Sequence, residues 1–332
     1  MFTIVNIIGV ALVMIMINHV ILFIFVTNYG KAFRLAFFMN WATRFISNLG
    51  HPSCNGVKFM TRNFYLTVNK DIKIGVWHTL PKGLSDSIGE KSLSSKKYRR
   101  SFFENCIRNY KYRIVIYCHG AFGYRGNTKS ISVANVIASK NCHVFMLDYR
   151  GYADSTGDSN EEGFYEDLRC LYTYVYRLAP GSVYIWGHSM GAAVACKVAG
   201  DMCNINKSPK GLMLESGFTT AFDAFIYFPF NTVYRSLSYV YKYIAQRCDA
   251  YCLRMRNIDN ILNVTCPITL VHAKDDWVVP FFMSQQLYIV ANEAGKVVRM
   301  FIFNDDQMLG HSHIITAPEF LTILDLFLEI KK

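Results

Sequence analysis

The chain contains 332 residues, of which 52% are hydrophobic and 15% are aromatic, so it is long and apolar enough to bury one large core. Its ten cysteines form no Cys-x-x-Cys pair and are too sparse for a disulfide scaffold; we interpret them as mostly buried small apolar residues. The formal charge of +11 suits an anionic membrane surface or an anionic substrate, and a well-solvated basic surface accounts for it equally well.

A transmembrane anchor is predicted at the N-terminus, within residues 1–30. The stretch from Ile4 to Val26 contains no Lys, Arg, Asp or Glu. At about 1.5 Å per residue, a helix of this length spans a hydrocarbon core of roughly 30 Å. The stretch lacks the basic n-region and the small-x-small cleavage site of a signal peptide, which favours an uncleaved anchor.

Residues 31–56 are predicted to form an amphipathic membrane-proximal segment. Four aromatic residues recur at every fourth position of this segment: Phe33, Phe37, Trp41 and Phe45. Asn40 and Arg44 fall on another face, so a helix here would either lie in the membrane interface or pack on the domain that follows. The Pro- and Gly-containing run 51–56 ends the segment.

Residues 57–332 are typical of one α/β domain, which we expect to be the catalytic domain. Short apolar runs, mostly separated by helix-length segments, predict a buried, mainly parallel sheet with helices on both faces. Eight runs are expected to be strands: Phe64–Val68, Ile72–His78, Ile114–Cys118, Val144–Leu147, Val183–Trp186, Leu212–Leu214, Ile268–Val271 and Val297–Phe303. Residues 81–111 are rich in Ser, Lys and Arg and predict a surface loop with some helix.

One interval between two predicted strands, residues 218–262, is too long for a simple crossover helix and is rich in Phe and Tyr. Open α/β sheets bind their ligands at the carboxyl ends of the strands. We therefore expect this interval to form a cap insertion over that edge, lined for an apolar ligand. The alternative is an ordinary helical layer packed on the core.

A serine at the apex of a predicted strand, turn and helix is the first sign of chemistry. Residues 187–191, Gly-His-Ser-Met-Gly, follow an apolar run and precede a run of helix formers. The flanking glycines are expected to let the backbone take the strained turn of a nucleophile elbow, with Ser189 at its apex. A Gly-rich turn with a capping serine has the same motif. The residues around the motif must therefore distinguish a catalytic elbow from a structural turn.

A serine nucleophile needs a histidine base and an orienting carboxylate, which in this fold follow in the order Ser, Asp, His. Asp276 follows a predicted strand within an Asp-x-x-Val-Pro sequence and is the preferred acid, with Asp275 as the alternative. Two histidines follow the last predicted strand, and we prefer His311 to His313 because it comes after a glycine in the loop. No third ligand of suitable spacing accompanies this pair, so neither a metal nor another cofactor is expected.

An oxyanion hole is predicted from two backbone N–H groups. One belongs to Met190, directly after the serine, and the other to Ala121, in the loop after a predicted strand. His119 and His188 lie beside these turns, and we expect them to make structural hydrogen bonds that hold the turns.

Two arginines near the predicted site are expected to serve the fold. We predict that Arg125 and Arg150 form ion pairs with Asp148 or Asp154, with an anionic headgroup as their alternative partner. The remaining charge is dispersed, and the cluster at residues 96–100 has no recognisable nucleic-acid-binding module around it, so no nucleic-acid partner is expected.

Five groups of residues share a family pattern: Asp71–Pro81; His119-Gly120 with Gly123 and Arg125-Gly126; Asp148–Gly151 with Asp154-Ser155; Val183–Gly191; and His272–Pro280. Together they resemble the membrane-anchored α/β-hydrolase-domain lipases that act on lysophosphatidylserine and monoacylglycerols. The resemblance runs from about residue 72 to the C-terminus. It implies Ser189 as nucleophile, Asp276 as acid and His311 as base. The sequence departs from the family pattern at Ala121-Phe122, where the family commonly has Asn-Ala.

The resemblance also implies an endoplasmic-reticulum membrane protein with a lumenal catalytic domain. The sequence Asn263-Val264-Thr265 would be a usable N-glycosylation site on that side. The basic residues that follow the anchor, Lys31 and Arg34 among them, favour a cytosolic domain by the positive-inside rule. We expect the lumenal side.

The sequence therefore predicts a serine lipase that hydrolyses the acyl ester of lysophospholipids and monoacylglycerols through an acyl-enzyme. A palmitoyl-protein thioesterase of the same fold is the alternative, and an inactive lipid-binding scaffold is a remote one. The expected partners are a lipid substrate and the membrane; nothing in the sequence specifies an oligomeric state.

Overall fold

The computed structural model describes residues 37–43, 48–88, 100–108, 112–231, 238–251 and 253–330, together with residues 9, 13, 16, 17, 20, 34, 35 and 46. The predicted anchor, residues 1–30, lies almost entirely outside this set. Among the described residues, no helix combines the length and the apolarity that a membrane crossing requires.

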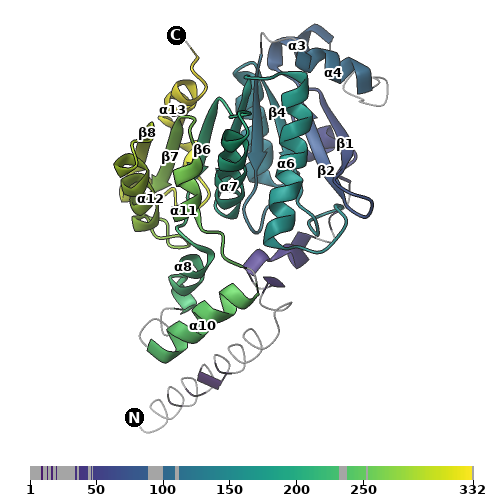
Figure 1. The fold of residues 1–332 in the computed structure, drawn as a ribbon. Coiled ribbons are helices and arrows are strands. Elements are labelled where there is room, and N and C mark those ends of the chain that lie inside the picture. Colours follow the sequence, from purple (N-terminus) through teal and green to yellow (C-terminus); the bar gives the residue numbers. More distant parts are fainter. Residues whose placement is uncertain are drawn as a thin grey trace.

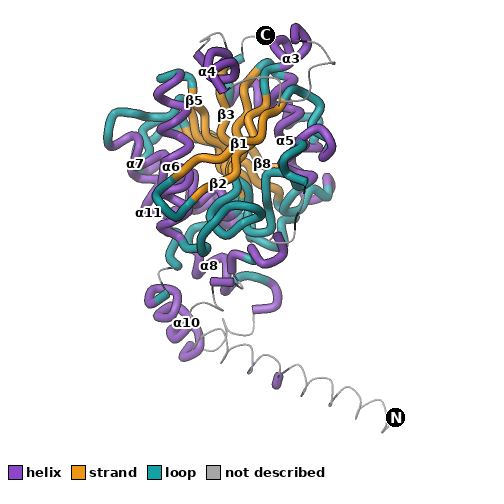
Figure 2. Tube along the Cα trace, turned by 90° about the vertical axis from the view of Figure 1, so that its right-hand side faces the viewer, coloured by secondary structure: helices purple, strands orange, loops and turns teal. Residues whose placement is uncertain are grey.

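An eight-stranded sheet forms the centre of the molecule (Figure 1, Figure 2). Its strands are β1 (Thr61–Thr67), β2 (Lys73–Thr79), β3 (Arg113–Cys118), β4 (Cys142–Leu147), β5 (Val183–His188), β6 (Gly211–Glu215), β7 (Ile268–Ala273) and β8 (Val298–Phe303). They lie in the order β1-β2-β4-β3-β5-β6-β7-β8. The pairs β1-β2 and β2-β4 are antiparallel, and all the others are parallel. All eight predicted runs are strands, which confirms the mainly parallel sheet.

Helices cover both faces of the sheet, as predicted (Figure 2). One face carries α5 (Thr128–Ser139) and α13 (Phe320–Phe327), and the other carries α6 (Glu161–Leu178), α7 (Met190–Asn204) and α12 (Phe282–Glu293). Along β3, Ile114 and Ile116 pack on the α6 and α7 side, while Val115 and Tyr117 pack on the α5 side. Because alternate side chains point to opposite faces and both faces are covered, the strands are continuous apolar runs.

Two helices occupy much of the basic stretch after β2. These are α3 (Lys82–Ile88) and α4 (Arg100–Arg108). In α4, Phe103 and Ile107 lie four residues apart on one face and are buried, and Arg100 donates to Glu104 at 2.6 Å on the outer side. This spacing agrees with the predicted mixture of loop and helix. Residues 89–99, which hold most of the basic cluster, lie outside the described part of the chain.

The membrane-proximal segment packs on the domain where the structure describes it. Phe38 is completely buried against Phe164, with ring centroids 4.8 Å apart. Met39 has a positive φ of 52°, and the 3₁₀ helix η1 (Asn40–Thr43) follows, so one regular helix does not run through the segment. Asn40, predicted on the polar face, is buried and donates to the Gly151 carbonyl at 2.8 Å, whereas Trp41 is exposed. After the break at Met39, Asn40 and Trp41 thus lie on the opposite of their predicted faces, whereas Phe37, before the break, packs on the domain as the spacing allows.

The 218–262 interval contains α8 (Ala221–Ile226), α10 (Ser238–Ala250) and α11 (Asn257–Asn260), and α10 projects from the body of the domain in both views (Figure 1, Figure 2). The remaining described helices are short 3₁₀ turns: η2 (Pro52–Asn55), η5 (Pro229–Asn231), η6 (Ile261–Asn263), η7 (Asp305–Gln307) and η8 (Ile314–Thr316).

Candidate active site

Ser189 lies in the turn between β5 and α7 with φ 55° and ψ −120°, so the serine itself carries the strained backbone of the elbow. The flanking glycines permit this turn, as expected, and they do so through close approach. A Cβ on Gly191 would lie 2.1 Å from the Cys118 carbonyl oxygen and one on Gly187 would lie 2.3 Å from the Gly191 oxygen. The helix can start this close to β3 only without those side chains.

The structure brings the preferred acid and the preferred base together. His311 Nδ1 donates to Asp276 Oδ2 at 2.7 Å, while Oδ1 of the same carboxylate accepts the N–H groups of Val278 and Val279, each at 2.9 Å. Asp276 is fixed by these contacts at the carboxyl end of β7. His311 is half-buried and arrives in the loop after β8, as the order Ser, Asp, His requires.

A second histidine, His272, also holds Asp276. His272 Nε2 lies 3.1 Å from Asp276 Oδ2, and its Nδ1 lies 2.6 Å from Ser284 Oγ. Burial alone would raise the pKa of the Asp276 carboxyl, but hydrogen bonds from His272 and His311 outweigh it and hold that pKa well below its usual value. Sequence reasoning missed His272; its place four residues before Asp276, at the end of a strand, was the available signal.

The alternative site residues occupy other positions. Asp275 Oδ2 accepts the Gly310 N–H at 2.9 Å, so this carboxylate fixes the loop that carries His311 and does not contact the imidazole ring. His313 is exposed, and its carbonyl oxygen accepts the Thr316 hydroxyl at 2.7 Å. The geometry therefore pairs Asp276 with His311, and it leaves Asp275 and His313 in supporting positions.

The two predicted oxyanion donors flank the serine. Met190 is the first residue of α7, so no carbonyl within the helix accepts its N–H. Ala121 follows Gly120, and a Cβ on Gly120 would lie 3.2 Å from Ser189 Cβ. The loop after β3 is therefore in contact with the elbow, where it can present the Ala121 N–H to a substrate oxygen.

The histidines beside these turns make the structural hydrogen bonds expected of them. His119 Nδ1 donates to the Gly120 carbonyl at 2.8 Å, and His188 Nε2 donates to the His311 carbonyl at 2.9 Å. Burial lowers the pKa of His119 to about 4 and, together with the nearby Lys129 ammonium, holds the pKa of His188 well below its usual value. Both rings are therefore neutral at physiological pH.

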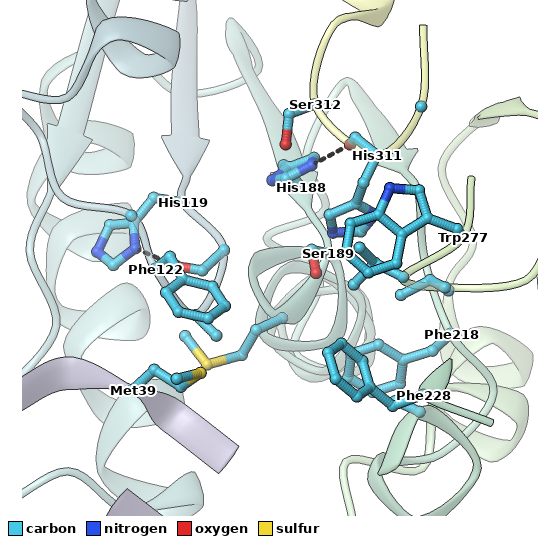
Figure 3. Close-up of a pocket in the computed structure, with 18 of the residues that line it drawn as sticks. Met39, His119, Phe122, His188, Ser189, Phe218, Phe228, Trp277, His311 and Ser312 are labelled. Atoms are coloured by element: carbon cyan, nitrogen blue, oxygen red, sulfur yellow. Dashed lines mark hydrogen bonds between the residues drawn. The ribbon is translucent and has the colours of Figure 1, made fainter. Parts of the chain in front are cut away.

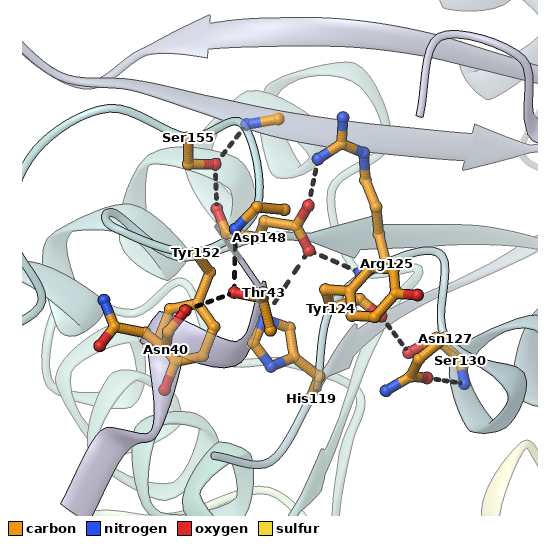
Figure 4. A network of polar contacts seen from close by, with 12 residues as sticks. Asn40, Thr43, His119, Tyr124, Arg125, Asn127, Ser130, Asp148, Tyr152 and Ser155 are labelled. Carbon is orange, nitrogen blue, oxygen red and sulfur yellow. Dashed lines mark hydrogen bonds and ion pairs between the residues drawn. The ribbon is translucent and has the colours of Figure 1, made fainter. Parts of the chain in front are cut away.

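The arginines form the predicted kind of contact, with one change of partner. Arg125 pairs with Asp148 and with Asp154, the latter at 2.7 Å, and Figure 4 shows its contact with Asp148. Arg150 pairs instead with Asp167, at 2.7 Å, because the first turns of α6 pack against its side chain at Gly163. The expectation that Arg150 pairs with Asp148 or Asp154 is wrong.

A cavity of about 980 Å³ opens at the carboxyl ends of the strands and includes Ser189 in its wall. Aromatic and other apolar residues from the membrane-proximal segment and the 218–262 interval form one end of it: Phe37, Met39, Phe218, Phe225, Phe228 and Ile244. Figure 3 shows His188 and Ser312 beyond Ser189 at the opposite end, away from Met39, Phe218 and Phe228. The serine thus lies between an apolar and a polar part of one cavity.

Lys129 and Glu215 form a partly buried ion pair at the polar end, and sequence reasoning missed both. Lys129 lines the cavity next to His188, and its Nζ contacts Glu215 Oε1 at 2.8 Å. The other oxygen, Oε2, accepts Trp186 Nε1–H at 2.9 Å. These residues belong to no motif and lie far apart in the sequence. Within the described residues, no group of three or more His, Cys, Asp or Glu side chains is placed to hold a metal ion.

The fold and the elbow define the class of the protein as an α/β hydrolase, and a family model for the alpha/beta hydrolase fold matches residues 113–223. An α/β hydrolase from Vibrio vulnificus superposes with a TM-score of 0.65 at 15% identity, over 89% of this chain and 92% of its own. An esterase from Pyrococcus furiosus superposes with a TM-score of 0.60 at 14% identity, over 86% and 95%. These structures share the fold.

Sequence relatives define the family more closely. The chain is 33% identical to the lysophosphatidylserine lipase ABHD12 of Danio rerio over 286 residues, which cover 85% of this chain and 72% of the relative. The ABHD12 of Xenopus tropicalis is 32% identical with the same coverage, and the human protein ABHD12B is 28% identical over 81% of this chain and 72% of its own. The chain belongs to the ABHD12 family of α/β-hydrolase lipases, in agreement with the resemblance found in the sequence.

Proposed function

We propose that the protein is a serine lipase that hydrolyses the acyl ester of lysophospholipids and monoacylglycerols. Ser189 is the nucleophile, His311 the base, and Asp276 the group that orients the base. The observation that carries the proposal is the position of Ser189 between the apolar and polar ends of one cavity. A lipid with one acyl chain and a polar headgroup would place its ester at the serine. About 980 Å³ lies at the upper end of the usual range for ligand sites.

The reaction follows from the positions of these groups. Ser189 Oγ attacks the ester carbonyl while His311 Nε2 accepts its proton, and Asp276 Oδ2 holds the Nδ1–H tautomer and stabilises the imidazolium. The N–H groups of Met190 and Ala121 bind the oxyanion. His311 then returns the proton to the departing alcohol, and water, activated by the same histidine, releases the fatty acid from Ser189.

Lys129 supports an anionic headgroup among the possible lipids. Its ammonium lines the polar end of the cavity, and burial lowers its pKa despite the Glu215 carboxylate beside it. A cation that has lost much of its hydration gains from a further anionic partner. A lysophosphatidylserine headgroup would supply that partner, and the lysophosphatidylserine lipases among the relatives agree with this choice.

The test of the proposal uses membranes that contain the full chain. A fluorophosphonate probe should label the wild type and not Ser189→Ala, and hydrolysis of lysophosphatidylserine by the variant should fall by about 10⁶-fold. His313→Ala is the matched control, because its ring belongs to the same loop but does not contact Asp276. Labelling that persists in Ser189→Ala would refute the assignment of the nucleophile.

We further propose that residues 1–30 anchor the chain in the endoplasmic-reticulum membrane with the catalytic domain in the lumen. The family resemblance supports this side, as does the position of Asn263 and Thr265, which are both exposed on the surface around η6. A glycosidase should increase the gel mobility of the wild type and leave Asn263→Gln unchanged. An unglycosylated domain that protease digests in sealed microsomes would reverse the orientation.

A further inference from the structure

Three large apolar side chains stand exposed around the opening of the cavity. Phe122 is 62% exposed, Trp277 61% and Met308 82%, and each of them also lines the cavity. They come from three separate loops, which follow β3, β7 and β8. Figure 3 shows Phe122 and Trp277 on opposite sides of Ser189. We call these three residues the apolar rim.

The backbone at Met308 indicates that this exposure is not incidental. Met308 adopts the left-handed conformation, with φ 47° and ψ 44°, which is unfavourable for a residue with a Cβ. Packing of the side chain does little to offset this unfavourable backbone conformation, because Met308 is the most exposed of the large apolar side chains described. An exposed apolar group of this kind, continuous with an apolar cavity, marks a surface that another apolar phase covers.

The membrane-proximal segment places the same opening near a bilayer. Phe37 and Met39 form part of the cavity wall. The predicted anchor ends near Val26, about eleven residues before Phe37, and a chain of that length reaches at most about 40 Å when extended. Phe37, and with it this part of the cavity wall, therefore cannot lie farther than about 40 Å from the end of the predicted anchor.

We propose that the apolar rim is a membrane-docking surface: Phe122, Trp277 and Met308 insert among the lipids, so that a single-chain lipid passes from the bilayer into the cavity without crossing water. The proposal rests on the lipase function proposed above. A bilayer is the occupant, because the rim encloses the entrance for a molecule that itself resides in a bilayer. Each methylene group that passes from the bilayer through water lowers the equilibrium constant for that step about fourfold. A path that keeps the acyl chain out of water from bilayer to cavity therefore has a much lower free-energy barrier.

A lipid-quenching experiment tests the contact directly. Trp77 and Trp186 are fully buried, whereas Trp41 and Trp277 are exposed. The full-length Trp41→Phe variant is reconstituted into phosphatidylcholine vesicles with bromine-labelled acyl chains, and Trp41→Phe combined with Trp277→Phe supplies the background. We expect bromine to quench the fluorescence that belongs to Trp277, and to do so in about 1 M salt as well, because the contact is apolar. Unquenched Trp277 fluorescence would overturn the proposal.

Turnover measurements test the consequence for substrate entry. Phe122, Trp277 and Met308 are replaced together by Ser, and activity is compared between an ester embedded in vesicles and a water-soluble short-chain ester. The ratio of vesicle to soluble turnover should fall by about tenfold or more, since every rim side chain loses its favourable transfer into lipid. The matched control replaces Ile205 and Val297. Both are exposed apolar residues, and they lie after the end of α7 and before β8, near the amino ends of the strands and away from the cavity.

The outcomes separate the docking proposal from the lipase proposal. An unchanged ratio in the rim variant, or an equal fall in the control variant, would overturn the docking surface. If the wild type hydrolyses neither ester more than Ser189→Ala does, the lipase proposal fails, and the quenching experiment still reports whether the rim contacts lipid.

Discussion

At the scale of single residues, the contacts of Asp276 predict a clear difference between two adjacent carboxylates. Asp276→Asn should lower kcat by about 10⁴-fold, because an amide in this position no longer holds His311 in the Nδ1–H tautomer. Asp275→Asn should cost far less, since its amide oxygen can still accept the Gly310 N–H. Steady-state kinetics on one soluble ester measure both.

The control for this pair is the fraction of active protein, measured with a fluorophosphonate titration. Equal loss of kcat in the two variants would contradict the pairing of Asp276 with His311 and return Asp275 to consideration as the acid. A large loss confined to Asp276→Asn would support the hydrogen bond as the one that catalysis uses.

The buried pair of Lys129 and Glu215 predicts a headgroup effect. Lys129→Met together with Glu215→Gln removes both charges, so that no uncompensated charge is left inside. We expect kcat/KM for lysophosphatidylserine to fall about tenfold more than kcat/KM for a monoacylglycerol with the same acyl chain, because only the anionic headgroup loses a charged partner. Lys129→Arg keeps the cation and should retain the preference. Parallel losses on both lipids would show that the pair serves the fold alone.

These residues also show which parts of the site the sequence could reveal. Ser189, Asp276 and His311 belong to motifs with a fixed chain order, so they could be chosen without a structure. Lys129, in the first turn of α5, and Glu215, the last residue of β6, lie 86 positions apart and become neighbours only in the folded domain. No local pattern marks such a contact, because it depends on the order of strands in the sheet.

At the scale of elements, the segment before the domain makes a testable contribution to stability. Phe38 is fully buried among aromatic rings, and its carbonyl oxygen accepts the Tyr152 hydroxyl at 2.5 Å. Phe38→Ala should lower the free energy of unfolding by about 3–5 kcal/mol, the usual result of truncating a buried phenylalanine. Urea unfolding of the full chain in detergent measures the change.

Trp41→Ala is the matched control, because its side chain is 54% exposed although it lies only three residues away. Its effect should stay within about 0.5 kcal/mol. If the two substitutions lower the free energy of unfolding equally, the segment does not pack on the domain as described. The predicted interfacial helix would then be the better description of residues 31–56.

The elements differ in how far the sequence could predict them. The strands were recognisable because β3 to β7 are buried on both faces and are therefore short, continuous apolar runs. The position of β4 between β2 and β3 was not recognisable, since nothing in a single strand specifies its neighbours. The faces of Asn40 and Trp41 were predicted incorrectly, because spacing arguments assume one regular helix and the backbone turns at Met39.

At the scale of the whole molecule, buried neutral histidines predict sensitivity to acid. His143 Nδ1 accepts from His78 Nε2 at 3.0 Å, and His143 Nε2 donates to the Cys106 carbonyl at 3.1 Å, so the ring has no place for a second proton. Burial, with a contribution from the nearby Arg62 cation, lowers the pKa of His143 to about 4. The unfolded chain therefore binds a proton that the folded chain refuses between about pH 6.5 and pH 4.

The folded state favours the neutral His143 ring. The contribution of this ring to the free energy of unfolding is therefore complete above pH 6.5 and is lost as the pH falls toward 4. One such histidine should cost about 2 kcal/mol of unfolding free energy between pH 7 and pH 5. His143→Gln keeps an acceptor for His78 and a donor for Cys106 but does not titrate, so its loss over the same interval should be smaller than that of the wild type by about this amount. Groups away from the His78–His143 pair titrate equally in both proteins, so the difference between their urea-unfolding curves isolates the protonation of this pair. Identical pH dependence in the two proteins would mean that the ring is already protonated, or exposed, in the folded state.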